Sequence, residues 1–287
     1  MSRQNAALVE TLLQGEAVLA LTLTDDADDP VLEPGVGETP LWPSVCVTAL
    51  FAGDSELDAL YQKLSLVPGI DRPQQVSFRK FEDRQWQREW LDRFKPMQFG
   101  SNLWIVPGEQ EVPPGAGAVD VLRLGPGLAF GTGTHPTTRL CLQWIDGYDF
   151  EARTVVDYGC GSGVLGIAAA IKGAAVVVCV DNDPQALVST MENAIRNGVT
   201  NRIQVMSPEE YEALSADVVL ANILAGPLIE LAPVLVASLG KHASLVMSGV
   251  LDEQADEVTA AYEPVLQGIT RATDDGWVRL HGNRRQT

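Results

Sequence analysis

A glycine-rich stretch, residues 155–170 (VVDYGCGSGVLGIAAA), holds the residues of this chain that are best suited to binding a cofactor. Two patterns overlap in it. Read from Gly161, it is Gly-x-Gly-x-x-Gly, the turn that holds the pyrophosphate of a dinucleotide. Read from Asp157, it is Asp-x-Gly-x-Gly-x-Gly, the loop of enzymes that hold S-adenosylmethionine. The stretch therefore predicts either a nicotinamide cofactor or a methyl donor.

The charges around this stretch favour the methyl donor. A pyrophosphate needs the positive potential of backbone N–H groups at a helix start, and Asp157 would repel it. S-adenosylmethionine carries a sulfonium and an ammonium but no phosphate, so a nearby carboxylate stabilises it directly or through water. No arginine or lysine lies between Arg153 and Lys172 to meet a phosphate. The alternative is a glycine turn that only lets a helix pack on a strand.

Two polar residues end predicted strands further along the chain. Asp181 ends AAVVVCVD, where a carboxylate can accept both hydrogen bonds from a ribose diol. Both candidate cofactors contain that ribose, so Asp181 does not choose between them. Asn222 follows ADVVLA, and its amide oxygen could accept hydrogen bonds from an amine nucleophile and aim the lone pair at the methyl carbon. A local turn is the alternative interpretation of Asn222.

A second loop lies in LGPGLAFGTGTHPTTRLCLQWI, residues 124–145, and runs into a predicted helix. Its glycines and threonines could fold over the methionyl end of the donor. They could also form a phosphate nest, although Arg139 is the one basic residue beside it. His135 could take a proton, or it could have a structural role before Pro136.

The pattern of apolar residues divides the chain. From about residue 150, apolar β-branched runs alternate with predicted helices, which predicts an α/β fold with a parallel sheet covered on both faces. Earlier, two predicted helices and three predicted strands, the last at 74–81, form a small α+β unit. A polar helix with Trp86 and Trp90 on one face follows, typical of packing against a neighbouring domain. The predicted domains are residues 1–80, a linker helix and strand at 81–115, and a donor-binding domain at 116–287.

Composition narrows the class of protein. The formal charge of −18 disfavours binding to nucleic acid or anionic membranes and suits a partner with amines or basic patches, although solubility alone would account for it. The four cysteines and three histidines have no metal-ligand spacing, so no metal site is expected. Scattered thiols and the lack of an N-terminal signal pattern predict a cytoplasmic protein.

Four segments together resemble one family. GLAFGTGTHPTT, DYGCGSGVLGIAA, VDNDPQAL and VVLANILAGPL are similar to the PrmA family, the methyltransferases of ribosomal large-subunit protein L11. The first and last segments separate this family from other class I methyltransferases, which share only the glycine loop. The resemblance runs from about ETPLW to the end of the chain. Family members usually open on a β-strand, whereas this chain opens on a predicted helix.

The resemblance implies a class I methyltransferase fold, which is Rossmann-like with a seven-stranded, mostly parallel sheet, joined to the smaller N-terminal α+β domain for substrate recognition. It implies S-adenosylmethionine as cofactor and transfer of methyl groups to lysine side chains and the α-amino group of the ribosomal protein. The implied donor contacts are Thr138, Gly159, Asp181 and Asn222, and Asn222 is also the candidate catalytic residue. We expect a monomer that binds neither nucleic acid nor a membrane.

The sequence leaves other functions open. The chain could methylate another protein, a small amine or a glutamine amide, although amide-nitrogen enzymes usually show Asn-Pro-Pro-Tyr where this chain has NILA. It could also be an adaptor that binds S-adenosylmethionine without turnover, against which the intact glycine loop argues.

Overall fold

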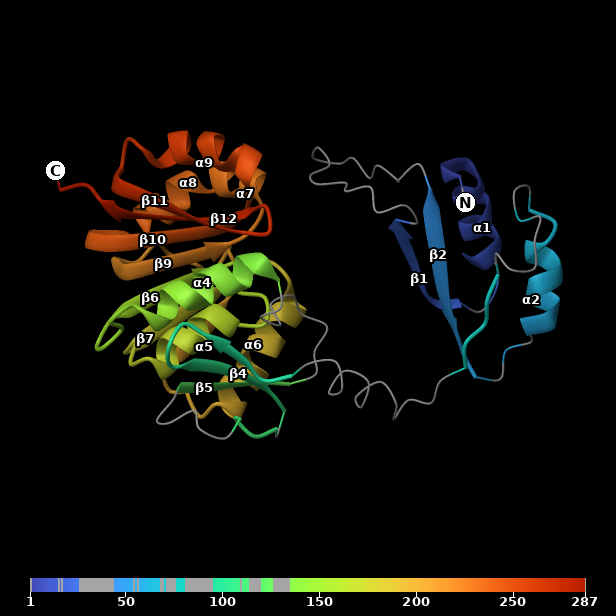
Figure 1. Cartoon of the computed structure of the whole chain (residues 1–287), viewed down its shortest axis with the longest axis horizontal. Coiled ribbons are helices and arrows are strands. Elements are labelled where there is room, and N and C mark those ends of the chain that lie inside the picture. Colours follow the sequence, from blue (N-terminus) through green and yellow to red (C-terminus); the bar gives the residue numbers. More distant parts are fainter. Residues whose placement is uncertain are drawn as a thin grey trace. The chain divides into compact units, whose positions relative to one another are not determined.

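The structure is a computed structural model of the chain (Figure 1). It describes residues 2–14, 16, 18–25, 44–53, 55, 57–67, 70, 76–80, 95–108, 110–113, 120–125 and 135–286. Contacts within the chain separate two compact units, Met1–Gln85 and Trp86–Thr287. The predicted helix with Trp86 and Trp90 and the loop at 126–134 lie outside the described residues.

The first unit is a small α+β structure, as the sequence predicts. Strands β1 (Val18–Asp25) and β2 (Val45–Phe51) form an antiparallel pair. Helices α1 (Arg3–Gln14) and α2 (Leu57–Leu64) supply most of the buried apolar side chains of its core. Alternate residues of β2 face that core, because successive side chains of a strand point to opposite sides. This unit therefore has a hydrophobic core of its own.

The strand predicted at residues 74–81 is wrong in the part that the structure describes, since residues 76–80 form no strand. Val76 is partly buried against the core of this unit. The ring of Phe78 lies edge-on to that of Tyr61, with 6.4 Å between centroids. Phe78 is nevertheless 45% exposed, so the alternating pattern does not mark a buried strand face.

The second unit is built on a seven-stranded, mostly parallel sheet in the order β11-β12-β10-β9-β6-β7-β8. Of the seven strands, β12 alone runs in the opposite direction to the other six. The central strands are apolar and β-branched because helices bury both of their faces. The strands are β6 (Thr154–Tyr158), β7 (Val176–Val180), β8 (Ile203–Met206), β9 (Ala216–Asn222), β10 (Leu239–Leu251), β11 (Leu266–Asp274) and β12 (Trp277–Arg284).

Helices cover both faces of this sheet (Figure 1). One face, with Val155 and Cys179, packs against α4, α5 and α6, and the other, with Val156 and Val178, packs against α7, α8 and α9. The helices are α4 (Pro136–Asp146), α5 (Val164–Ile171), α6 (Pro184–Arg196), α7 (Ala225–Glu230), α8 (Ala232–Ala237) and α9 (Ala255–Tyr262), with a short 3-10 helix at Asp252–Gln254. No helix in the described parts of the chain has the length and apolarity needed to span a bilayer.

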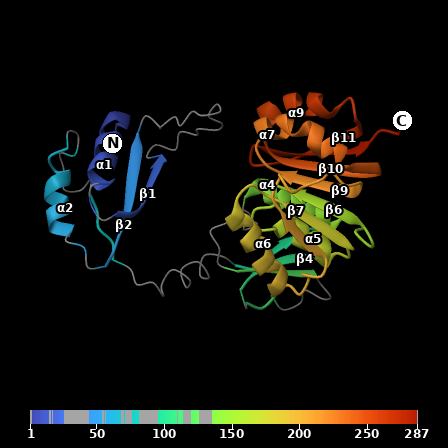
Figure 2. The same cartoon turned by 180° about the vertical axis from the view of Figure 1, so that it is seen from behind.

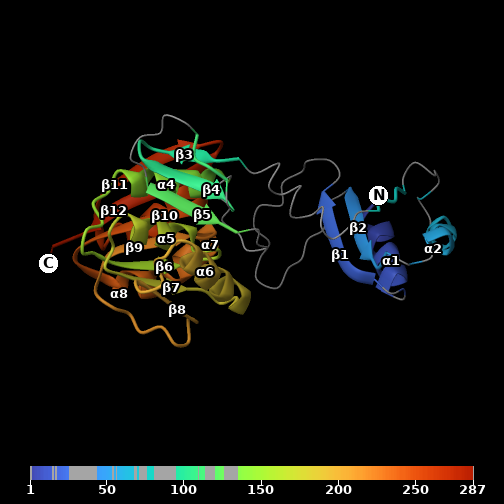
Figure 3. The ribbon, with the colours of Figure 1, turned by 90° about the horizontal axis from the view of Figure 1, so that it is seen from below.

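A second, three-stranded sheet packs outside α4 and α5 (Figure 3). It consists of β3 (Met97–Phe99), β4 (Leu103–Pro107) and β5 (Asp120–Leu124). Its apolar side chains, Leu103 and Ile105 among them, join the core formed by those helices and the main sheet. The sequence assigns residues 97–107 to the linker, whereas β3 pairs with β4 and β4 pairs with β5 inside the second unit.

Two elements of the second unit differ from the sequence expectation. The sequence predicts β12 but not β11, an edge strand that is rich in exposed polar residues. It also predicts one helix over PLIELAPVLVASLG, whereas α7 and α8 are separate and meet at Leu231. Pro233 explains the break, because proline has no N–H to donate within a helix and its ring clashes with the carbonyl four residues earlier.

The small sheet generates a prediction about truncation. A fragment of residues 86–287 should unfold cooperatively, whereas a fragment of 115–287 should be less stable by at least about 4 kcal/mol. The shorter fragment loses Phe99, Leu103 and Ile105, and each fully buried apolar side chain contributes about 1.5–3 kcal/mol. Urea unfolding of both fragments measures the difference. Equal midpoints would show that β3 and β4 are dispensable.

Candidate active site

The four implied donor contacts gather at one edge of the main sheet. Gly159 follows β6, Asp181 follows β7 and Asn222 ends β9. These parallel strands are neighbours in register, so their carboxyl ends meet where open α/β sheets bind ligands. Thr138, in the first turn of α4, lies at the same edge because Asn222 donates a hydrogen bond to it. The structure thus brings all four residues to one place.

The glycine loop between β6 and α5 has room for backbone only. Gly159 has a φ of +75°, and a Cβ there would collide with Cγ2 of Ile223. Gly163, the N-cap of α5, also has a φ of +75°, and its Cβ would lie 2.7 Å from Cγ2 of Thr190. A side chain at either glycine would clash with its neighbour, and residues other than glycine rarely adopt a positive φ. The loop, which we call the glycine cradle, therefore requires glycine at both positions, because its backbone packs directly against Ile223 and Thr190.

The buried side chain of Asp157 holds the start of α5 against the end of β6. Its side chain is only 1% exposed, and its Oδ2 accepts the N–H of Gly166 in the first turn of α5 at 2.8 Å. Burial raises its pKa to about 7, although the Gly166 bond opposes the shift and the charge of Asp181 adds to it. The hypothesis of a direct contact between Asp157 and the cationic donor is not supported, because this carboxyl is buried and already bonded. Its role here is to join β6 to α5.

Two backbone N–H groups orient the carboxylate of Asp181. Its Oδ2 accepts the N–H of Gly161 at 2.8 Å, and its Oδ1 accepts the N–H of Asp183 at 3.0 Å. An ionised carboxylate has about four acceptor positions, so each oxygen keeps a second one. The residue is partly exposed. These backbone bonds fix the orientation of the carboxylate and leave acceptor positions that can receive further hydrogen bonds.

Asn222 is held by Thr138. The Asn222 Nδ2 donates to Thr138 Oγ1 at 3.3 Å, and Thr138 is only 2% exposed. Because the amide nitrogen faces α4, the amide oxygen is turned away from Thr138. Asn222 is partly exposed, which leaves this oxygen able to accept a hydrogen bond from a ligand.

His135 has a structural role at the start of α4. Its Nδ1 accepts the N–H of Thr137 at 3.4 Å and lies 2.8 Å from the Thr137 hydroxyl, so it caps the helix. Its ring lies edge-on to Trp277, with 4.9 Å between centroids. Burial, and then the charge of Arg139, lower its pKa. These contacts favour the structural interpretation over proton transfer.

Sequence reasoning missed Thr190 and Asn193 of α6, which hydrogen-bond to backbone carbonyls of the glycine loop. The sequence does show a row of polar residues, Thr190, Asn193 and Asn197, which are spaced by about one helical turn and could have indicated this role. On an α/β helix that row normally faces solvent, whereas here Thr190 and Asn193 are buried.

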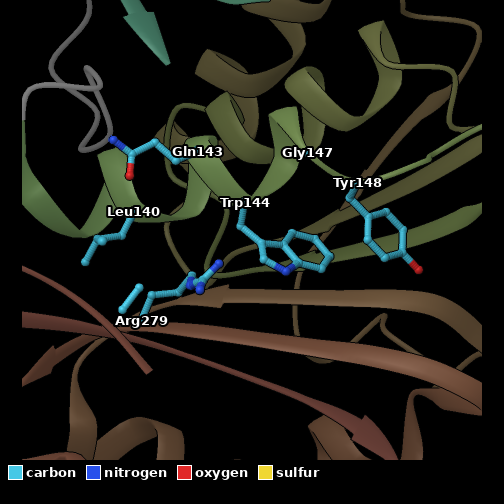
Figure 4. A pocket seen from close by; sticks show the side chains of 7 residues that line it. Leu140, Gln143, Trp144, Gly147, Tyr148 and Arg279 are labelled. Atoms are coloured by element: carbon cyan, nitrogen blue, oxygen red, sulfur yellow. The ribbon is translucent and has the colours of Figure 1, made fainter. Parts of the chain in front are cut away.

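A cavity of about 390 Å³ lies elsewhere, between α4 and the β11–β12 pair (Figure 4). Trp144 and Tyr148 stack along it with 4.5 Å between ring centroids, and Arg279 faces them across the cavity. It is lined by Leu140, Gln143, Trp144, Gly147, Tyr148, Ala272 and Arg279. None of the four implied donor contacts borders it, so it does not define the reaction.

The reversed strand β12, inserted between β10 and β11 of an otherwise parallel sheet, the glycine cradle after β6 and the carboxylate after β7 together define the class. The protein is a class I S-adenosylmethionine-dependent methyltransferase.

Comparison with known proteins identifies the family. The sequence profile described as "Ribosomal protein L11 methyltransferase (PrmA)" matches residues 1–285. The ribosomal protein L11 methyltransferase of Azotobacter vinelandii is 47% identical over 283 residues, covering 98% of this chain and 96% of its own. That of Alteromonas mediterranea is 45% identical over 284 residues, covering 99% and 97%. The chain therefore belongs to the ribosomal protein L11 methyltransferase family.

A solved structure supports the assignment to this family. The crystal structure of a ribosomal protein L11 methylase from Lactobacillus delbrueckii subsp. bulgaricus matches with a TM-score of 0.60 at 30% identity. The match covers 67% of this chain and 100% of that chain.

The buried Asp157 generates a prediction about pH. Its pKa in the folded protein, about 7, lies above the usual value of 3.8, so the folded state holds a proton that the unfolded chain releases. The resulting stability is complete below about pH 4 and is lost as pH rises towards 7. Between pH 5 and 8, the wild type should lose about 2–3 kcal/mol of unfolding free energy relative to Asp157→Asn, which does not titrate. Urea unfolding at both pH values is the measurement, and parallel pH dependence of the two proteins would contradict it.

Proposed function

We propose that this protein transfers methyl groups from S-adenosylmethionine to amines of ribosomal protein L11, namely lysine side chains and the α-amino group. The observation that carries the proposal is the family match, which spans residues 1–285 and so includes the whole site. Relatives bearing the name ribosomal protein L11 methyltransferase align over almost their entire lengths.

The described residues fit this donor. The glycine cradle lies at the carboxyl end of β6, where open α/β sheets bind ligands, and Asp181 offers acceptors for a ribose diol. Asn222, with Thr138 behind it, would bind next to them at the end of β9. When bound, S-adenosylmethionine supplies a methyl group activated by its sulfonium.

The chain's own contribution to the reaction is alignment. An amine must arrive neutral with its lone pair directed at the methyl carbon, and the Asn222 oxygen can accept an amine N–H and hold it in that direction. The hydrogen bond from Asn222 to Thr138 stops the amide from rotating. Holding two reactants in line and excluding water supplies about 7–11 kcal/mol in favourable cases.

The charge around the site suits a lysine-rich substrate. Exposed carboxylates follow the carboxyl ends of β7, β8, β10 and β11, on the same edge of the sheet as the glycine cradle. Complementary charge speeds encounter with a basic partner. We call this set the acidic rim, and it comprises Asp183, Glu209, Glu210, Asp252, Glu253 and Asp275.

We assign substrate recognition to the N-terminal domain, residues 1–80, and donor binding to the region from residue 116. The separate hydrophobic core of the first unit supports this division. We also place the protein in the cytoplasm, where the unpaired Cys141, Cys160 and Cys179 would stay reduced.

An assay with labelled S-adenosylmethionine tests the function. We expect label on purified L11, no label on L11 whose amines have been acetylated beforehand, and slow or no labelling of free lysine and of a glutamine peptide. The fragment 86–287 should bind the donor but label L11 poorly. Labelling of the glutamine peptide or free amine in preference to L11 would support the alternative enzymes. Donor binding without transfer to any acceptor would support the adaptor.

Variants of Asn222 separate binding from alignment. Asn222→Ala should lower kcat by more than it raises the donor Kd, because alignment is expressed in the transition state. Asn222→Asp keeps the shape and the acceptor but adds a charge that favours the protonated amine, so its activity should require higher pH. Calorimetry and single-turnover rates across pH are the measurements. Loss of donor affinity in full proportion to the rate in both variants would reduce Asn222 to a binding residue.

A further inference from the structure

Helix α6 supports the glycine loop with two side chains. The hydroxyl of Thr190 donates to the carbonyl oxygen of Gly161 at 3.1 Å, and Nδ2 of Asn193 donates to the carbonyl oxygen of Ser162 at 2.9 Å. Thr190 is 0% and Asn193 6% exposed. Residues three apart on a helix lie on the same face, so both reach the loop from one side. Helices α5 and α6 lie side by side (Figure 2).

The hydrogen bonds of the loop show why this support is needed. The Cys160 carbonyl accepts the N–H of Gly163 at 2.8 Å, and the Gly163 carbonyl accepts the N–H of Ile167 at 2.8 Å. The two carbonyls between them, at Gly161 and Ser162, receive their donors from α6. A buried carbonyl without a donor is costly, so removing either side chain would make the peptide plane turn.

The orientation of these planes matters for the ligand. In a trans peptide the C=O and the following N–H point in opposite directions. Fixing the Gly161 carbonyl on Thr190 therefore directs the N–H of Ser162 away from α6. The peptide before it is fixed as well, because Asp181 accepts the N–H of Gly161 at 2.8 Å. The loop is held on one side by the proposed ribose acceptor and on the other by α6.

Asn193 also holds a second part of the chain. Its Oδ1 accepts the N–H of Gly125, one residue beyond β5, at 3.1 Å. A Cβ at Gly125 would lie 2.8 Å from Nη2 of Arg196, so this strand end packs closely on α6. A single amide thus joins the glycine loop to the end of β5.

We propose that Thr190 and Asn193 are positioning residues of the methyl-donor site, which fix the Gly161 and Ser162 peptide groups in the conformation that binds the donor. They do not touch the reacting atoms and act through the loop. The proposal rests on the proposed function for the identity of the donor.

Asn197, one turn further along α6, provides a matched control. Its Oδ1 accepts the N–H of Arg123 at 2.7 Å, and its Nδ2 donates to the Arg123 carbonyl at 2.8 Å. It therefore binds α6 to β5 as Asn193 does. None of its hydrogen bonds in the described residues reaches the glycine loop. Asn197→Leu should lower the melting temperature without changing donor affinity.

Paired substitutions at Thr190 isolate the hydrogen bond. Thr190→Val keeps the shape and the methyl that packs under Gly163 but cannot donate to Gly161, whereas Thr190→Ser keeps the hydroxyl and loses that methyl. We expect Thr190→Val to raise the Kd and KM for S-adenosylmethionine about tenfold, with kcat at saturating donor within about twofold of wild type. Thr190→Ser should bind the donor as wild type does.

Substitutions at Asn193 test the second bond. Asn193→Leu removes both bonds, and Asn193→Asp keeps an acceptor for Gly125 but cannot donate to Ser162. Both should raise the donor Kd about tenfold. Calorimetric Kd, the KM and kcat with L11, and melting temperatures of all five variants are the measurements, made on the full chain.

The outcomes are distinguishable. Wild-type donor affinity in Thr190→Val and Asn193→Leu would overturn the positioning role while leaving the proposed function intact. An equal rise in Kd for Asn197→Leu would also overturn it, because general destabilisation would then account for the effect. A wild-type protein that does not bind S-adenosylmethionine would overturn the proposed function and this inference together.

Discussion

The turn from β6 into α5 is the constraint on which the site depends. It closes because Gly159 and Gly163 adopt positive φ angles that other residues rarely adopt, and because the buried Asp157 bonds the first turn of α5. Asp181 and the side chains of α6 complete the support from either side. The main sheet then matters chiefly as a frame, since its parallel register brings β7 and β9 to the same edge as this turn.

Much of this frame can be predicted from sequence. Apolar β-branched runs alternating with helices predict the parallel sheet, which the structure confirms, and the comparisons confirm the family that four short segments indicate. Local patterns fail where a neighbour decides the outcome. Strand β11 is polar because it lies at an edge, and the alternating residues 76–80 form no strand. Pro233 divides a helix that periodicity alone would continue.

For the site as well, the sequence predicts where residues lie along the strands but not how their side chains are oriented. Its glycines and the residues that end strands are visible in the sequence, because their positions follow from where strands stop. The direction in which a side chain points is not visible. Asp157 could face a ligand or the core, and only the packed structure shows that it is buried under the loop. Thr190 and Asn193 lie about thirty residues after the carbonyls they bind, and the rotation of α6 decides whether they face the loop or water.

The acidic rim has a consequence for how the product leaves. Methylation of a lysine adds bulk but keeps the positive charge. The rim therefore attracts the modified protein as strongly as the unmodified one, and Coulombic attraction cannot drive turnover. Under the proposed role of Asn222, discrimination between an unmodified and a fully methylated amine comes from bulk and from the loss of N–H donors rather than from charge.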